Sequence, residues 1–347
     1  NIPNGVTSIR KAAFYNCSSL NSIIIPDAVT VIDSFAIYGC SSLTSVNIPN
    51  GVTSIRKATF YNCSSLHTVT LPESLTSIGY CAFAYCESLD SINMPSSVTH
   101  LDVGAFAGCV SLTTVDIPEG VTFIGEECFG ECSSLISVNI PSTVTFIGDY
   151  AFWSCINLPS IALPEGITSL REGIFYECGN LISIDIPSTV TSIGDSVFYK
   201  CVSLVSVNIA EGVTSIGSGC FVECPLLENI YCYATTPPAL TEGTFSSYDA
   251  TLHVPANNVG DYQAAAYWQN FNIVPMETSI EDYDLADRGV CYYNGTVHNA
   301  QGLKLTVYNM SGQLVTMGDG DIDMRSYPRG MYVVTDDKGG RMKVMNN

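Results

Sequence analysis

The amino-acid sequence predicts a β-rich solenoid of ten stacked 23-residue coils with little helix. Cysteines recur at a constant interval of 23 residues, and the same apolar residues recur at fixed places within each interval. A coil of this length cannot bury its apolar side chains alone, so neighbouring coils must stack to form one continuous core. The ladder cysteines are Cys17, Cys40, Cys63, Cys86, Cys109, Cys132, Cys155, Cys178, Cys201 and Cys224.

Each coil reads L-x-x-V-x-I-P-x-x-V-T-x-I-x-x-x-A-F-x-x-C-x-x, as from Leu43 to Ser65. The segment L-x-x-V-x-I alternates apolar and polar residues and ends at Pro, which is typical of a short strand closed by a turn. V-T-x-I predicts a second extended segment, and its Thr, present in all ten coils, suits a half-buried ladder. Stacked at roughly 4.8 Å, such segments form parallel ladders.

We therefore expect a right-handed parallel solenoid over residues 1–233, with the repeated Phe and Cys side chains in its core. Acidic residues occupy alternate coils just after the Pro position, which keeps like charges about 10 Å apart, near the Debye length in physiological salt. These acidic residues are Asp27, Glu73, Glu119, Glu165 and Glu211. The side chains expected in the core include Phe60, Phe83, Phe106, Cys63, Cys86 and Cys109.

The repeat pattern decays after Cys224, and residues 234–275 are predicted to cap the solenoid. Within this cap, Asp261 to Phe271 has apolar residues at helical spacing and predicts a short helix. From residue 276 an acidic linker leads to alternating patterns in Leu303–Tyr308 and Met331–Val334. These patterns predict a small β-sandwich-like domain over residues 276–347.

Composition excludes several classes of function. Hydrophobic residues make up 46% of the chain and charged residues 13%, so a packed core is expected. The net charge of −20 would repel phosphate backbones, so we expect no nucleic-acid partner. No apolar run is long enough for a transmembrane helix. Because Asn1 to Gly5 already lie inside a repeat, we expect an export signal or cap to precede this sequence.

The repeats resemble the BspA-like leucine-rich repeats of Bacteroidetes and of some spirochaete surface proteins. The resemblance covers about two-thirds of the chain and is carried by Ile186-Pro187, Val190 to Gly194, Phe198 and Cys201. It implies a leucine-rich-repeat solenoid in a secreted or cell-surface protein, since members are described as adhesins for host matrix proteins and other cells. Local departures are Ile37 for Phe, Ala210 for Pro, and Arg10, Asp33, Arg56, Asp102 and Arg171 for Gly.

The C-terminal segment carries a second resemblance. Leu305 to Val315, Ile322-Asp323 and Pro328 to Val334 are similar to the C-terminal sorting domains of Bacteroidetes secretion. Such β domains also occur in exported proteins that lack this role.

Cofactor and catalytic chemistry are not indicated. A 23-residue Cys spacing is never C-x-x-C, so we expect no metal site, and we favour buried, reduced cysteines over disulfides between coils. The run Asp319 to Asp323 opens like a calcium loop but has Gly330 where the closing Glu belongs, which favours a polar turn. Histidines are scattered, without the partners of a nucleophilic site. They are His67, His100, His253 and His298.

Two surfaces are candidates for binding. In leucine-rich repeats the strand face is concave and is the usual contact surface; here its polar rows include Thr68, Ser91, Thr114 and Ser137 in one row and Thr70, Asn93, Asp116 and Asn139 in the next. If the chain is extended just after the repeated Phe, the following residues face outward and form two aromatic stripes around a notch of small residues, suited to sugar or protein. Alternatively, these rings stack on one another and cover the coil. The stripes are Tyr15, Tyr38 and Tyr61, then Trp153, Tyr176 and Tyr199; the notch is Ala84, Ala107 and Gly130.

The sequence thus predicts a non-enzymatic, secreted or cell-surface binding or adhesion protein, with a protein or glycan ligand of the host or of other microbes. We expect a monomer with no cofactor. The alternative is a structural spacer without a ligand, for which the uniform repeats argue. A glycosidase is disfavoured because the carboxylates lie in rows and not in pairs.

Overall fold

The computed structural model describes residues 2–276, 285, 290–293, 296–309, 314–327, 330–337 and 341–346. The chain divides into two compact units, Asn1–Met276 and Glu277–Asn347.

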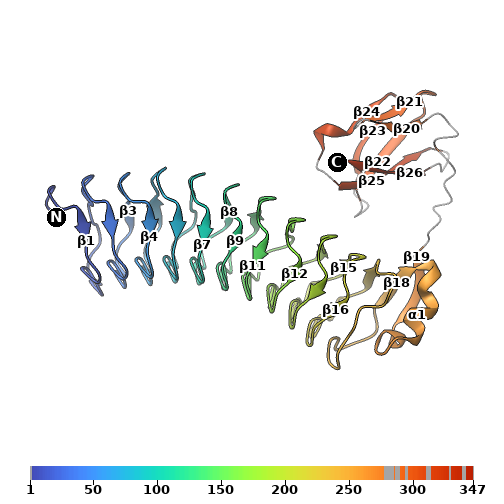
Figure 1. The fold of residues 1–347 in the computed structure, drawn as a ribbon, viewed down its shortest axis with the longest axis horizontal. Helices are drawn as coiled ribbons and strands as arrows, with labels where there is room; N and C mark the ends of the chain where they lie inside the picture. The colour runs from blue at the N-terminus through green and yellow to red at the C-terminus, as the bar shows by residue number, and fades with distance from the viewer. Residues whose placement is uncertain are drawn as a thin grey trace. The chain divides into compact units, whose positions relative to one another are not determined.

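The first unit is a stack of coils that follow one another in chain order (Figure 1). One ladder runs through the L-x-x-V-x-I segments, with Val46 opposite Val69 and every pairing parallel. It comprises β3 (Ser45–Asn47) with β5 (Thr68–Thr70), then β8 (Thr114–Asp116) with β10 (Ser137–Asn139), then β13 (Ser183–Asp185), β15 (Ser206–Ile209), β17 (Asn229–Cys232), β18 (Thr251–Pro255) and β19 (Asn272–Met276).

A second parallel ladder runs through the V-T-x-I segments, with Ile55 opposite Ile78. It comprises β1 (Ser8–Ile9) with β2 (Val31–Ile32), then β4 (Ser54–Ile55), β6 (Ser77–Ile78), β7 (His100–Leu101), β9 (Phe123–Ile124) and β11 (Phe146–Ile147), then β12 (Ser169–Leu170), β14 (Ser192–Ile193) and β16 (Ser215–Ile216). The two ladders confirm the predicted solenoid of parallel coils.

The repeated Thr of the V-T-x-I segment links successive coils through its side chain. The Thr76 hydroxyl donates to the Thr53 carbonyl at 3.0 Å, and the Thr214 hydroxyl donates to the Thr191 carbonyl at 3.0 Å. Equivalent bonds join Thr30 to Thr7, Thr99 to Thr76, Thr145 to Thr122 and Thr191 to Thr168. The Thr row therefore adds hydrogen bonds between coils as well as β propensity.

A column of stacked Phe rings fills the core, as predicted. The Phe60 and Phe83 centroids lie 5.3 Å apart with an interplanar angle of 3°, and Phe60 has no exposed surface. Offset stacking of this kind adds to the free energy gained by burying the rings. The column continues through Phe106, Phe129, Phe152, Phe175, Phe198, Phe221 and Phe245.

The cap adds two shorter coils, β18 and β19, to the first ladder. The helix predicted from Asp261 to Phe271 is wrong in its extent: helix α1 spans Val259–Ala264, between the 3₁₀ turns η1 (Ala256–Asn258) and η2 (Trp268–Asn270). The chain leaves helical geometry because Ala265 is extended and Tyr267 has a φ of 67°. Tyr262 and Trp268 are buried as predicted. The Tyr262 hydroxyl donates to the Ala234 carbonyl, and the Trp268 indole donates to the Pro238 carbonyl.

The second unit consists of two antiparallel sheets around a small apolar core. One sheet has the order β20 (Val290–Tyr293), β21 (Thr296–Asn299), β24 (Ile322–Asp323); the other has the order β23 (Leu314–Gly318), β22 (Leu305–Asn309), β25 (Gly330–Asp336), β26 (Arg341–Asn346). The 3₁₀ turn η3 spans Met324–Ser326. Val297 of the first sheet and Val307 and Val334 of the second are buried in this core. Two packed sheets fit the predicted sandwich-like domain.

Candidate functional site on the solenoid surface

The strand face presents two parallel rows of exposed polar side chains. In β5, Thr68 and Thr70 are exposed on either side of the buried Val69, and β8 and β10 repeat this pattern. Strand pairing holds Thr114 opposite Ser137, and Asp116 opposite Asn139. The face can therefore offer hydroxyl, amide and carboxylate groups in register along the stack.

The strand ladder is interrupted at the coil between β5 and β8. Ser91 and Asn93 are exposed there and Ile92 is buried, but the segment is not a strand. The Thr113 amide still donates to the Asp90 carbonyl, so the coils remain stacked. The eight polar residues predicted for this face thus lie on one surface, although two of them fall outside the strands.

The segment after the repeated Phe is not extended, which corrects the premise of the aromatic stripes. It forms turns in which every fourth residue has a positive φ, as at Ala58 (50°) and Asn62 (56°). The Ala58, Phe60 and Asn62 amides donate to carbonyls of the following coil. Side-chain direction therefore follows this turn geometry and not the alternation of a strand.

The aromatic residues cover the coils by stacking on one another. The Tyr15 and Tyr38 centroids lie 4.7 Å apart at 9°, and the Tyr38 and Tyr61 centroids 4.8 Å apart at 3°. Tyr176 and Tyr199 form a second stack at 4.7 Å. Ring faces that cover each other are not available as a flat platform for a sugar.

The notch of small residues is filled. Tyr85 meets the edge of Tyr61 at 5.4 Å, and a Cβ added at Gly108 would lie 2.5 Å from Cδ1 of Tyr85. From the other side, the Trp153 ring packs directly against Gly130, where an added Cβ would lie 2.1 Å from Nε1 of Trp153. Ala84 and Gly130 are buried and Ala107 is half-buried, so this region is packed surface and not a groove.

The ladder cysteines donate hydrogen bonds between coils, a role that sequence reasoning missed. The Cys63 thiol donates to the Ile37 carbonyl at 3.2 Å, and the Cys86 thiol donates to the Phe60 carbonyl at 3.2 Å. The same bond recurs from Cys40 to Cys224, and each of these thiols is free. Burial raises the pKa of the Cys63 thiol to about 12, which opposes thiolate reactivity.

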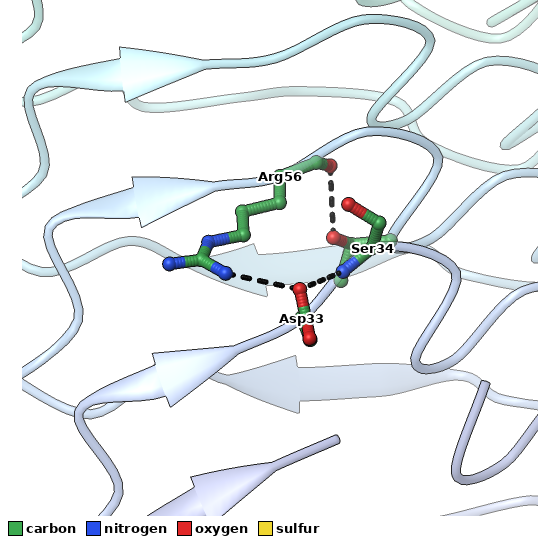
Figure 2. Close-up of polar contacts among 4 residues, drawn as sticks. Asp33, Ser34 and Arg56 are labelled. Atoms are coloured by element: carbon green, nitrogen blue, oxygen red, sulfur yellow. Dashed lines mark hydrogen bonds and ion pairs between the residues drawn. The ribbon is translucent and has the colours of Figure 1, made fainter. Parts of the chain in front are cut away.

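Charged residues also link neighbouring coils. Figure 2 shows the Asp33 carboxylate between the Ser34 amide and the Arg56 guanidinium of the next coil, at 2.9 and 3.0 Å. These two donors lower the pKa of Asp33. Farther along, Ser188 donates through its amide and its hydroxyl to the Glu165 carboxylate. The alternation of acidic residues with Ser here creates a hydrogen bond in addition to separating like charges.

Acidic side chains gather on the later coils. Burial, together with Glu126 and Glu131, raises the pKa of Glu127. Across residues 67–276 there are 21 acidic residues, and the basic ones are Arg171 and Lys200. Arg171 pairs with Asp149 at 2.8 Å and Lys200 with Glu177 at 3.1 Å, so both cations already have an acidic partner. Residues 67–276 of the solenoid therefore carry a strongly negative charge.

Among the described residues, no group of three His, Cys, Asp or Glu side chains is arranged so that it could hold a metal ion. In the run that resembles a calcium loop, Asp321 accepts from His298 and from the Asn299 amide, and Asp323 pairs with Arg325. These contacts fit the predicted polar turn. No helix among the described residues is long and apolar enough to cross a membrane.

Solved bacterial repeat proteins are similar to this chain. A leucine rich cell surface protein from Faecalibacterium prausnitzii is 36% identical, covers 66% of this chain and 70% of its own, and has a TM-score of 0.47. A T. pallidum leucine rich repeat protein is 31% identical, with coverages of 53% and 77% and a TM-score of 0.40. A leucine-rich repeat protein from Bacteroides ovatus is 25% identical, with coverages of 73% and 91% and a TM-score of 0.37.

No curated protein sequence matches the chain. The family model described as BspA type leucine rich repeat region, in six copies, matches residues 1–113 and 101–228. Those residues contain the Ile-Pro, Val-Thr, Phe and Cys positions of the repeat. Their strand segments form the ladders, and the apolar side chains among them form the core. The chain therefore belongs to the BspA-type leucine-rich repeat family.

Proposed function

We propose that this protein is a secreted or cell-surface binding module whose strand face contacts a protein or glycan of a host or of other microbes. The observation that carries the proposal is the two in-register rows of exposed polar side chains from Thr68 to Asn139. A repetitive face gains affinity by summing weak, equivalent contacts across several coils. The aromatic rows, whose rings cover one another, are the weaker candidate surface.

The relatives and the charge support this proposal. The similar protein from Faecalibacterium prausnitzii is described as a cell surface protein, which fits export of this chain. The resemblance of residues 276–347 to a sorting domain suggests how a Bacteroidetes cell would export and attach it. With a net charge of −20, the protein should prefer basic ligands, and binding should weaken as salt rises.

The test begins with a screen of the full chain against host matrix proteins and glycans. On a ligand found there, Asn93, Asp116 and Asn139 are replaced together by Lys. The matched control is Asn50→Lys, Ser96→Lys and Glu119→Lys, which makes the same change of charge at exposed turn positions. We expect at least tenfold weaker binding for the strand-face variant and little change for the control. Equal loss in both variants would point to net charge alone.

A structural spacer remains the second candidate function, favoured by the uniformity of the coils. Two further variants separate it from binding: Tyr15, Tyr38 and Tyr61 replaced by Ala, and deletion of residues 276–347. If neither surface variant weakens adhesion while the deletion abolishes it, the solenoid is the spacer and the binding proposal is wrong.

A further inference from the structure

The later coils expose a row of large apolar side chains. Five of them occupy two places in the repeat, the residue after the ladder Cys and the residue after the first Leu. The sixth, Leu226, lies two residues after Cys224. The six members are 38% to 54% exposed and are termed the apolar stripe: Val110, Ile136, Ile156, Ile182, Val202 and Leu226.

Stacking of the repeat does not require apolar residues at these two places. In the first four coils the equivalent residues are all polar: Ser18, Asn21, Ser41, Thr44, Ser64, His67, Glu87 and Asp90. These coils stack through the same ladders as the later ones. Exposed apolar side chains are unfavourable in water, so their appearance at these two places in the later coils alone indicates a role outside the fold.

Members of the apolar stripe lie on successive, hydrogen-bonded coils. The Ile182 amide donates to the Pro159 carbonyl at 3.1 Å, and the Val205 amide donates to the Ile182 carbonyl at 2.8 Å. Pro159 lies on the same coil as Ile156, and Val205 lies on the same coil as Val202. Both are half-buried, so Ile182 has an apolar residue at the equivalent place on each neighbouring coil. The members alternate between the two places, so each coil from Val110 to Leu226 exposes one large apolar side chain. Apolar surface that extends over several coils marks interaction sites.

An acidic row accompanies the apolar stripe. Glu131, Glu177 and Glu223 each immediately precede a ladder Cys, on the coils that carry Ile136, Ile182 and Leu226. Lys200 occupies the same place between the last two and pairs with Glu177. By contrast, residues 1–66 hold four basic and two acidic side chains. The apolar stripe therefore lies on the acidic part of the solenoid, which selects a partner that is both apolar and basic.

The apolar stripe ends beside a cavity of about 300 Å³ between the tenth coil and the cap. Buried Phe221, Cys224 and Phe245 line it together with the exposed carboxylates of Glu223 and Asp249. Its volume is at the low end of the roughly 300–1,000 Å³ of small-molecule sites. It suits one anchoring side chain of a larger partner better than a complete ligand.

We propose that the apolar stripe is a docking surface for a basic amphipathic helix of a partner protein. Coils stacked at roughly 4.8 Å nearly match the 5.4 Å pitch of an α-helix, so a helix along the stack would present one apolar residue to each coil. Lys and Arg beside the apolar face of the helix would meet the acidic row. The inference rests on the proposed binding function, but it assigns a different surface and partner chemistry.

The probe is an 18-residue amidated peptide with Leu along one helical face and Lys elsewhere, and its binding to the full chain is measured by fluorescence anisotropy. Two control peptides replace every Leu by Ser or every Lys by Glu. The stripe variant is Ile136→Thr, Ile156→Ser, Ile182→Thr and Val202→Ser, which uses residues that the chain has at equivalent places. A thermal melt confirms that this variant is folded.

We expect the Leu–Lys peptide to bind with micromolar affinity, the stripe variant to lose at least tenfold, and both control peptides to bind at least tenfold more weakly. Equal binding by the stripe variant, or by the Ser–Lys peptide, would overturn the proposal. Sedimentation velocity tests a second copy as the occupant: a dimer that only the stripe variant dissolves would also overturn it. If the Lys variant of Asn93, Asp116 and Asn139 loses adhesion while the stripe variant keeps peptide binding, the proposed function stands and this inference fails.

Discussion

The Cys63 thiol lies 3.2 Å from the Ile37 carbonyl oxygen of the preceding coil and donates a hydrogen bond to it. Both groups are buried, so the bond replaces one that water would otherwise provide to the carbonyl. A disulfide would consume this donor. The ladder therefore depends on reduced thiols for hydrogen bonding as well as for packing.

Replacing Cys63 by Ala should lower the free energy of unfolding by about 1–3 kcal/mol, because a buried carbonyl loses its donor and a small cavity opens. Cys63→Ser keeps a donor and should cost less than Ala. Urea unfolding of the two variants and the wild type measures the difference. An Ala variant as stable as the Ser variant would show that the thiol bond contributes nothing.

The ladder thiols should count as free under denaturing, non-reducing conditions. Equivalent side chains on stacked coils point the same way, and each thiol from Cys40 to Cys224 is engaged with a carbonyl, so cross-linking of neighbours is disfavoured. Reaction with a chromogenic disulfide before and after reduction gives the count, and an oxidised sample provides the control. Five or more bridges per chain would contradict the hydrogen-bonded arrangement.

Stability should fall at alkaline pH. Burial raises the pKa of Cys63 and of Cys178 to about 12, above the ordinary thiol value near 8.5. A group with a raised folded-state pKa contributes stability that is complete below the unfolded pKa and is lost as pH rises through the folded pKa. Between pH 9 and 11, each such thiol should therefore cost about 1.4 kcal/mol per pH unit.

Urea unfolding at pH 7.5, 9 and 10.5 measures this dependence. Tyrosines titrate in the same range, so the decisive quantity is the difference between wild type and Cys63→Ala. The variant should have a shallower decline. Parallel declines would indicate that the Cys63 pKa is unchanged on folding.

Gly108→Ala should destabilise the solenoid by more than 2 kcal/mol. Its φ of 70° disfavours a side chain, and the new Cβ would overlap the Tyr85 ring. Gly243→Ala is the matched control, because its φ is 82° and nothing lies within 4 Å, so it reports the conformational cost alone. Tyr85→Ala combined with Gly108→Ala should reduce the loss to that of the control. An additive double mutant would exclude the steric contact.

The core and ladders were predictable from the sequence because a single periodicity determines them. Nearly every coil repeats its Phe and all repeat the Cys, and stacking within the ladder leaves these side chains no exposed surface, as at Phe83 and Cys86. The parallel ladders follow from the same periodicity, because residues 23 positions apart pair with each other, as Ile55 does with Ile78.

The turns were not predictable in the same way. Left-handed backbone is usually signalled by Gly or Asn, but here Glu131 and Lys200 also adopt it, with φ of 58° and 56°. Hydrogen bonds to the next coil hold these residues, and such bonds depend on stacking rather than on local sequence. An assumption of extended chain therefore assigned the wrong geometry to the aromatic rows.

The apolar stripe was missed for a related reason. Its residues occupy positions that vary between coils and are written x in the repeat pattern. A pattern built from the shared residues therefore does not include them. The available signal was the change from Ser and Thr in early coils to Ile136, Ile156 and Ile182 in later ones. Exposure of these side chains follows only from the stacked structure.

Large residues opposite glycines restrict how such a protein can change length during evolution. Asn16 faces Gly39, and Tyr85 faces Gly108, so removal of the coil that carries either glycine by unequal recombination would bring a larger residue against the facing side chain. Coils that carry neither member of a pair are free of this restriction. Residues 1–20 and 47–66, two coils apart, differ only at Ala13 and Thr59, as expected if copying occurred in steps of 46 residues.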